Sequence, residues 1–202
     1  MFLFVRISTA SRSVYLADMI RNTEKSWGLV SILFHWTMAA LFFSQFALGW
    51  YMQGVRNLLD QYVLYQWHKS FGFLILGLAV LRALWAVTSR RPGYPVEMPA
   101  SEKTLAHGSH ALLYLFLVIL PMTGWAIVST SPLPIATRFF GQFVIPSLPL
   151  GISMHSEQIW SSLHGFLAYA AIFLVCVHVL AALRHHLKNK DGVLTRMLWP
   201  RR

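Results

Sequence analysis

Residues 163–186 read LHGFLAYAAIFLVCVHVLAALRHH, and this stretch decides the fold. Its apolar run is long enough to cross a bilayer as a helix, which takes about 20 residues. The run also contains His164 and His178, fourteen positions apart. Fourteen helical residues advance roughly 21 Å and rotate through almost four turns, so both imidazoles lie on one face at different membrane depths. Ionisable side chains within a membrane are costly and usually functional, so we expect a site at each depth.

The composition of the whole chain is typical of a membrane protein. Hydrophobic residues make up 56% of its 202 residues and charged residues only 12%, which is far from the balance of a soluble domain. Four membrane spans are predicted, at about residues 27–51, 62–87, 104–128 and 159–183. Lipid offers no hydrogen-bond partners to a backbone, so each span is expected to be a helix. The sequence therefore predicts an all-α membrane protein, folded as an antiparallel bundle of four transmembrane helices.

Lysine and arginine residues are concentrated at one end of the predicted bundle. The thirteen at that end are Arg6, Arg12, Arg21, Lys25, Arg90, Arg91, Lys103, Arg184, Lys188, Lys190, Arg196, Arg201 and Arg202. The opposite end has only Arg56, Lys69 and Arg138, while Arg82 lies near the inner end of the second span. Because basic residues favour the cytoplasmic side, both termini of this multi-pass protein are expected on the cytoplasmic side of the membrane.

The formal net charge of +10 follows from this topology and from contact with anionic membrane lipid. No basic stripe with interleaved aromatic residues indicates a nucleic-acid partner. Three segments are predicted along the chain. Residues 1–26 form a cytoplasmic leader without the pattern of a signal peptide, and Met19 is an alternative start. Residues 27–187 form the transmembrane domain, and residues 188–202 form a basic cytoplasmic tail.

Four histidines are predicted to form two pairs at two depths. His35 and His178 lie about eight and six residues from the cytoplasmic ends of their spans, whereas His68 and His164 both lie near the outer ends. Two facing histidine pairs in a helical bundle are what two six-coordinate haems require. No C-x-x-C-H motif or cysteine cluster is present, so haem would be held non-covalently as haem b.

Other readings of the histidines stay open. A single polar residue in a membrane helix often only hydrogen-bonds a neighbouring helix. His107 and His110, three positions apart at the cytoplasmic start of the third span, are rival ligands, although binding of a haem propionate or a quinone is the expected role. His185 and His186 follow the fourth span and are expected to be solvated at the interface or to complement the helix C-terminus.

The histidine-bearing segments resemble those of a known family. They are SILFHW at residues 31–36, WHKSFG at 67–72, LAHGSHALLYLFLVILPMTGW at 105–125 and LHGFLAYAAIFLVCVHVLAALRHH at 163–186, with the tail KNKDGVLTRMLWPRR at 188–202. In this order they are similar to the bacterial cytochrome b561 family of small four-helix, dihaem, quinone-linked proteins. The resemblance implies two haems b in the bundle core, one ligated by His35 with His178 and one by His68 with His164. It also implies membrane electron transfer with ubiquinone, and at least one relative is a superoxide oxidase.

The expected function is that of a dihaem b electron carrier that links a donor, such as superoxide, to the ubiquinone pool, as in a superoxide:ubiquinone oxidoreductase. Lys69 and Arg138 would steer the superoxide anion toward the outer haem, or would merely anchor the membrane interface. The residues expected to build an apolar quinone slot are Phe139, Phe140, Gln142 and Trp160. The alternative function is that of a cytochrome b subunit that accepts electrons from a hydrogenase or dehydrogenase partner. Against this alternative stands the lack of a sizeable soluble docking domain.

Overall fold

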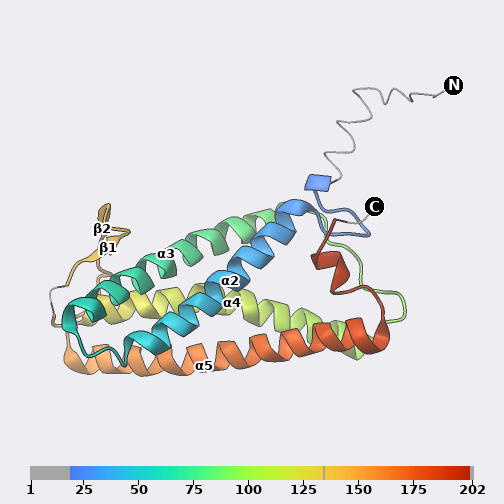
Figure 1. The fold of residues 1–202 in the computed structure, drawn as a ribbon. Helices are drawn as coiled ribbons and strands as arrows, with labels where there is room; N and C mark the ends of the chain where they lie inside the picture. Colours follow the sequence, from blue (N-terminus) through green and yellow to red (C-terminus); the bar gives the residue numbers. More distant parts are fainter. Residues whose placement is uncertain (1–18, 134, 201–202) are drawn as a thin grey trace, which may run out of the picture.

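The computed structural model describes residues 19–133 and 135–200, and its main elements are four long helices (Figure 1). These are α2 (Leu29–Met52), α3 (Leu58–Thr88), α4 (Ala100–Thr130) and α5 (Met154–Arg184). Each is long and apolar enough to cross a membrane. The four predicted spans are therefore confirmed as helices, and α3, α4 and α5 are longer at both ends than predicted. Most of the predicted leader, residues 1–18, lies outside the described residues.

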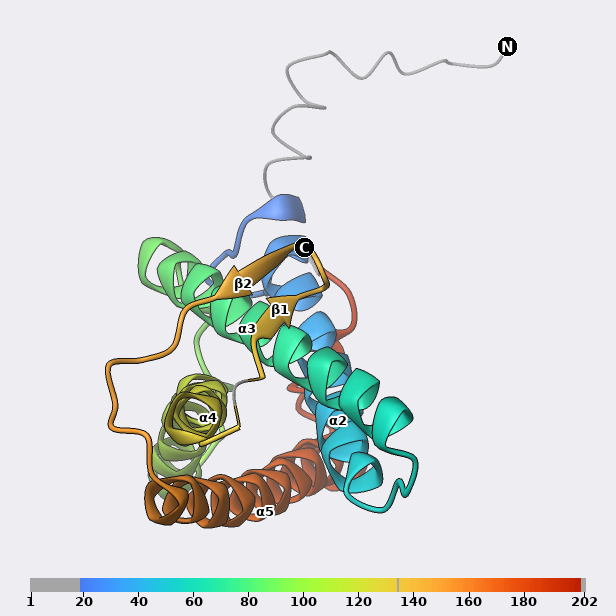
Figure 2. The same cartoon turned by 90° about the vertical axis from the view of Figure 1, so that its left-hand side faces the viewer.

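The helices form an antiparallel bundle. Helices that follow one another in the chain pack side by side, α2 with α3, α3 with α4 and α4 with α5, and Figure 2 shows the bundle from one end. A small apolar core of Met38, Ile75 and Ala79 lies between α2 and α3. Many other large apolar side chains are exposed on the surface of the bundle. Such a surface is unfavourable in water and suits contact with lipid.

One end of the bundle collects residues 19–28, 89–99 and 190–200, and we call it the basic end (Figure 1). Asn22 joins the first two of these segments to α2. Its side-chain NH2 donates to the carbonyl of Arg90, and its side-chain oxygen accepts from the N–H of Gly28 and from the hydroxyl of Ser31. Asn22 is buried, so these hydrogen bonds fix the start of α2 against the connection between α3 and α4.

The chain reverses its direction after α5. The helix continues into a short π-helix, η1 (His185–Asn189), and then Lys190 and Gly192 adopt left-handed conformations with φ of 53° and 78°. Such conformations are common where a helix ends, because they turn the chain sharply away from the helix axis. The tail then forms a single 3-10 turn, η2 (Thr195–Met197), on the basic end of the bundle.

Two hydrogen bonds hold the tail in this place. The guanidinium of Arg196 donates to the carbonyl of Gly93 at 2.9 Å, and the indole N–H of Trp36 donates to the carbonyl of Met197 at 2.7 Å. Trp36 follows His35 directly on α2, and its ring meets that of His35 edge-on with centroids 5.3 Å apart. The tail therefore contacts the immediate neighbour of a predicted ligand.

The opposite end of the bundle carries a β-hairpin, and we call it the hairpin end (Figures 1 and 2). Strands β1 (Thr137–Phe139) and β2 (Phe143–Ile145) pair in antiparallel fashion. They are joined by the three residues 140–142. The N–H of Gln142 donates to the carbonyl of Phe139, and between them Phe140 and Gly141 both have positive φ, 46° and 75°, as in a primed turn. The sequence predicted an all-α fold, without this hairpin.

Two side chains of α3 fasten the hairpin to the bundle. Gln66 donates to the carbonyl of Ala136 and accepts from the N–H of Arg138. Ser70 donates to the carbonyl of Arg138 and accepts from the N–H of Phe140. These residues lie one helical turn apart, so the hairpin is held against one face of α3, at the level of the histidine of that helix.

Candidate functional site

Two histidines face each other toward the hairpin end, and we call them the hairpin-end pair. His68 projects from α3 and His164 from α5, with ring centroids 6.2 Å apart and an angle of 82° between the ring planes. An imidazole nitrogen binds a metal at about 2 Å, so two imidazoles that hold one metal from opposite sides have centroids about 6 Å apart. The spacing of this pair therefore fits a single metal ion that both rings would hold.

A second pair lies toward the basic end, and we call it the basic-end pair. His35 of α2 and His178 of α5 have ring centroids 6.3 Å apart and an angle of 54° between the planes. His35 lies six residues after the start of α2, and His178 lies six residues before the end of α5. Both are thus roughly 9 Å from the basic end of their helices. The structure brings together each of the two histidine pairs that the sequence predicted.

Glycines of neighbouring helices leave room for the hairpin-end pair. A β-carbon at Gly49 of α2 would lie 3.1 Å from Cε1 of His68, and one at Gly124 of α4 would lie 3.4 Å from Cε1 of His164. In a close-packed interior a larger side chain at either position would displace the imidazole. Each ring of this pair therefore rests against the bare backbone of the helix that precedes its own.

Thr123 orients one ring of the hairpin-end pair. Its Oγ1 lies 2.9 Å from Nδ1 of His164 and donates its own proton to the carbonyl of Leu120. The hydroxyl therefore accepts from the imidazole, which puts the ring proton on Nδ1 and leaves the lone pair on Nε2. A hydrogen bond from the other ring nitrogen is the usual support of a metal-binding histidine.

Nδ1 of His68 is buried and has no hydrogen-bond partner among the described residues. Buried polar atoms in proteins are nearly always paired. His68 is thus not placed by hydrogen bonds in the way of an ordinary core histidine. Thr123, Gly49 and Gly124 were not predicted as parts of the site. The sequence gives a local signal for Thr123 and Gly124, because a polar residue and a glycine stand side by side there within an otherwise apolar span.

The predicted rival ligands lie beside the basic-end pair. The ring centroid of His110 is 5.4 Å from that of His178, which is less than the about 6 Å expected for two imidazoles on one metal. His110 is exposed. His107 is also exposed, and its Nδ1 lies 3.1 Å from the hydroxyl of Tyr94 in the connection between α3 and α4. The geometry therefore favours His35 over His110 as the partner of His178.

Residues 26–200 match the family model described as prokaryotic cytochrome b561. The chain belongs to the prokaryotic cytochrome b561 family. It is 33% identical over 178 residues to cytochrome b561 homolog 2 of Escherichia coli (strain K12), covering 88% of this chain and 93% of the relative. It is 28% identical over 156 residues to cytochrome b561 homolog 1 of the same organism, covering 76% and 83%. It is also 33% identical over 140 residues to the probable superoxide oxidase CybB of Yersinia pestis, covering 65% and 72%.

Membership of the cytochrome b561 family makes this protein a multi-pass membrane electron carrier and implies haem b as its cofactor. The resemblance predicted from the histidine-bearing segments is thereby confirmed. The residues present fit the group, because imidazoles face each other at the separation that one iron requires. The glycine contacts of the hairpin-end pair and the hydrogen bond that His164 donates to Thr123 fit it as well.

A cavity of about 340 Å³ opens beside the hairpin. Its lining residues are Tyr62, Val63, Gln66, Trp67, Ser70, Arg138, Phe140 and Gly141. Arg138 is exposed, and Lys69 is half-buried next to His68. The two cations that the sequence singled out thus lie at the same end as the hairpin-end pair. Of the four residues predicted to build a quinone slot, only Phe140 lines this cavity, so that slot is not gathered there.

The turn of the hairpin is held over α3 by aromatic contacts. The ring of Phe140 meets those of Trp67 and Phe71 edge-on, with centroids 5.6 Å and 5.1 Å apart. A positive φ is unfavourable for phenylalanine, and such strain persists only where the surroundings enforce it. The aromatic contacts therefore fix the turn directly above the helix that carries His68.

His185 forms the centre of a charged cluster at the basic end. It is buried, hydrogen-bonds the carboxylate of Asp191 through Nδ1, and has its Nε2 3.6 Å from a carboxylate oxygen of Glu102. Glu102 also pairs with Arg184 at 2.9 Å. Burial tends to raise the pKa of Asp191, but hydrogen bonds from His185 and from the N–H of Val193 outweigh it and hold this pKa below its usual value. Solvation, one of the two roles predicted for His185, is therefore wrong, since the ring is buried between Asp191 of the tail and Glu102 of α4.

Proposed function

We propose that this protein carries two haems b and passes electrons from a donor at the hairpin end to the ubiquinone pool. The observation that supports this proposal is the pair of facing histidines at each of two levels of one bundle. His68 with His164 would hold one haem, and His35 with His178 would hold the other, both without covalent attachment. A haem held in this way supplies reversible one-electron chemistry.

We place the hairpin end on the periplasmic side of a bacterial inner membrane and the basic end in the cytoplasm. The support is the distribution of lysine and arginine residues, most of which lie in the segments of the basic end. Short loops rich in these residues stay in the cytoplasm. In this orientation the hairpin-end pair is the one nearer to a periplasmic donor.

Superoxide is the donor that the charges favour. Lys69 and Arg138 place two cations at the end that carries His68, and Arg138 also lines the cavity beside the hairpin. A positive field attracts a small anion and raises its rate of encounter. The relative from Yersinia pestis that is named a probable superoxide oxidase supports the same donor. Each superoxide would lose one electron and leave as dioxygen, and two electrons with two protons would convert one ubiquinone to ubiquinol.

Ubiquinone would take up these electrons at the basic-end level. His110 is exposed and its ring lies 5.4 Å from that of His178, so a quinone beside it would be close to the basic-end pair. An imidazole can donate a hydrogen bond to a quinone carbonyl. This arrangement uses both levels, because the electron enters at one end of the bundle and leaves at the other.

The haem content tests the cofactor part of this proposal. A pyridine-haemochrome assay on the purified protein should give two haems b per chain, with a low-spin spectrum. His68→Ala and His164→Ala should each remove the same haem, and His35→Ala and His178→Ala should each remove the other. His110→Ala should keep both haems and slow reoxidation by quinone. Retention of both haems in His178→Ala, together with loss of one in His110→Ala, would reverse the assignment.

The donor is tested by mixing the oxidised protein with superoxide. The haems should become reduced, and added ubiquinone should reoxidise them. Reduction should slow as salt is raised, since the range of a charge shrinks to about 10 Å at 0.1 M ionic strength. Lys69→Glu and Arg138→Glu should slow reduction more than reoxidation, whereas Lys25→Glu at the basic end should not. Haems that stay oxidised with superoxide but are reduced by a purified hydrogenase or dehydrogenase would establish the alternative function.

A further inference from the structure

Arg82 is a cation inside the bundle that no carboxylate neutralises within the described residues, since none of their ion pairs includes it. Its Nε donates to the hydroxyl of Tyr114 at 3.2 Å, and its Nη1 lies 3.7 Å from the sulfur of Met38. Its guanidinium carbon is 5.1 Å from the centre of the Tyr114 ring. A neutral hydroxyl, a thioether and an aromatic face hold a guanidinium in place and leave its charge intact.

Arg82 lies at the level of the basic-end pair. It is six residues from the end of α3, at the same depth as His35 in α2 and His178 in α5. On α3 itself Arg82 lies fourteen residues, or roughly 21 Å, from His68 of the hairpin-end pair. The positive charge therefore distinguishes the two levels of the bundle.

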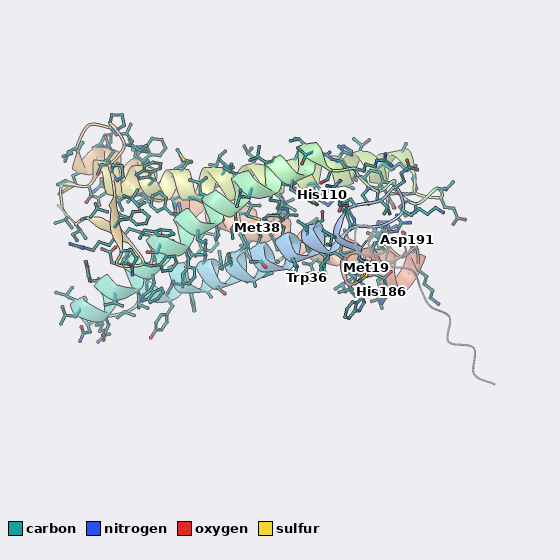
Figure 3. The ribbon with its side chains drawn as sticks, turned by 90° about the horizontal axis from the view of Figure 1, so that it is seen from above. Met19, Trp36, Met38, His110, His186 and Asp191 are labelled. Carbon is teal, nitrogen blue, oxygen red and sulfur yellow. The ribbon has the colours of Figure 1, made fainter. Side chains whose placement is uncertain are left out.

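The side chain of Arg82 points into the bundle. Side chains of a helix lean toward its N-terminus, and the N-terminus of α3 is at the hairpin end. Met38, which the guanidinium contacts, is buried three residues further from the basic end than His35. Figure 3 shows Met38 further from that end than Trp36 and Asp191. An arginine that only anchors the interface would extend in the opposite direction, toward the headgroups.

We propose that Arg82 raises the reduction potential of the haem held by the basic-end pair relative to that of the other haem, so that electrons collect at the basic-end level. Reduction adds one negative charge to a haem, and a fixed positive charge nearby stabilises that form. At about 10 Å and an effective dielectric constant of about 20, a unit charge changes an equilibrium constant roughly tenfold. The inference rests on the proposed function, because it requires a haem at each level.

In this proposal Arg82 acts through its charge on the reduction potential of the basic-end haem. The test is a potentiometric titration of the purified protein with both haems bound. The midpoint of the basic-end haem is the one that persists in His164→Ala. Arg82→Gln should lower it by ~59 mV, the equivalent of a tenfold change for one electron, and should change the other midpoint much less. Arg82→Lys keeps the charge and should retain the wild-type midpoint. Arg56→Gln removes an exposed charge at the hairpin end and is the matched control.

Tyr114→Glu is a second variant that keeps Arg82 and places a carboxylate beside it. The carboxylate would neutralise the charge of Arg82, so the basic-end midpoint should fall, as in Arg82→Gln. This variant therefore still tests the inference if Arg82→Gln loses a haem. An unchanged separation of the two midpoints in Tyr114→Glu overturns the inference. Equal falls in Arg82→Lys and Arg82→Gln also overturn it, because charge would then not be the cause. Fewer than two haems in the wild-type protein would instead contradict the proposed function.

Discussion

Replacing Thr123 by valine would remove one hydroxyl from the wall of the hairpin-end site and keep its shape. The imidazole N–H of His164 would then lose the acceptor that lies 2.9 Å away. Thr123 is only 5% exposed, so water is poorly placed to take over the hydrogen bond. The substitution therefore isolates the contribution of one hydrogen bond to the orientation of one predicted iron ligand.

The expected effect follows from the cost of an unpaired buried donor, which is about 1–3 kcal/mol. Each ~1.4 kcal/mol corresponds to a factor of ten in a binding constant. Loss of a hydrogen bond that supports a metal-binding histidine typically lowers metal affinity by about 10- to 100-fold. Thr123→Val should thus release the haem held by His68 and His164 roughly 10- to 100-fold faster. The haem of the basic-end pair should be retained as in the wild type.

Transfer of haem to an excess of apomyoglobin measures this release, because the two sites should give two separate phases. Thr123→Ser keeps a hydroxyl and should restore the slow phase. Thr130→Val is the matched control, since Thr130 is also buried on α4 and its hydroxyl donates to the carbonyls of Ala126 and Ile127. Wild-type release from Thr123→Val, or an equal acceleration in Thr130→Val, would refute the role given to the hydrogen bond.

Four further changes test the packing and the termini. Gly49→Val should reduce the haem content from two to one, because even a β-carbon would lie 3.1 Å from the ring of His68; two retained haems would contradict this. Asn22→Ala should lower the free energy of unfolding by about 2 kcal/mol, seen as an earlier thermal loss of haem absorbance, because it removes buried hydrogen bonds. Asp191→Asn should destabilise the protein at pH 7. Folding lowers the pKa of Asp191, so the stabilisation from its carboxylate is present above about pH 4 and is lost as the pH falls through the folded pKa. The melting curves of the wild type and of Asp191→Asn should therefore converge at low pH. Removal of residues 1–18 should leave membrane insertion and haem content unchanged, and loss of either would show that these residues support assembly.

The depth of each histidine could be predicted from the sequence because depth is proportional to position along a straight helix. His164 and His178 belong to one helix, so their separation did not depend on any packing detail. The facing of His35 with His178 needed only the antiparallel order of the helices, which the distribution of basic residues indicated. The sequence alone was thus sufficient to predict that these segments are helices and at what depth each histidine lies.

The side-chain neighbours of the histidines could not be predicted in the same way. Gly72 and Gly165 lie close to His68 and His164 in sequence, yet a β-carbon at either would not meet an imidazole. A β-carbon would meet an imidazole at Gly49 and Gly124, which lie on α2 and α4, the helices before those of His68 and His164. Which residue of one helix meets which residue of another depends on the rotation and the vertical offset of both, and these are set by packing along the whole interface.

The hairpin and the tail escaped prediction for a different reason. Phe140 adopts a left-handed conformation that its residue type disfavours, and it does so because its ring is held by aromatic residues of α3. Lys190 likewise gives little local signal for the reversal that brings Asp191 to His185. In both places tertiary contacts override the local preference of the backbone, so local patterns cannot identify the turn.

Arg82 shows where counting along a helix stops being sufficient. The count that places His35 at its depth places Arg82 at the same depth, so its level could be predicted from the sequence. The direction of a side chain with several rotatable bonds could not, because an arginine near a helix end can extend to the headgroups or into the bundle. The hydroxyl of Tyr114 and the sulfur of Met38 decide between these two directions. Because the side chain extends inward, its charge lies beside the basic-end pair. There it can act on electron transfer, whereas an outward side chain would only anchor the membrane interface.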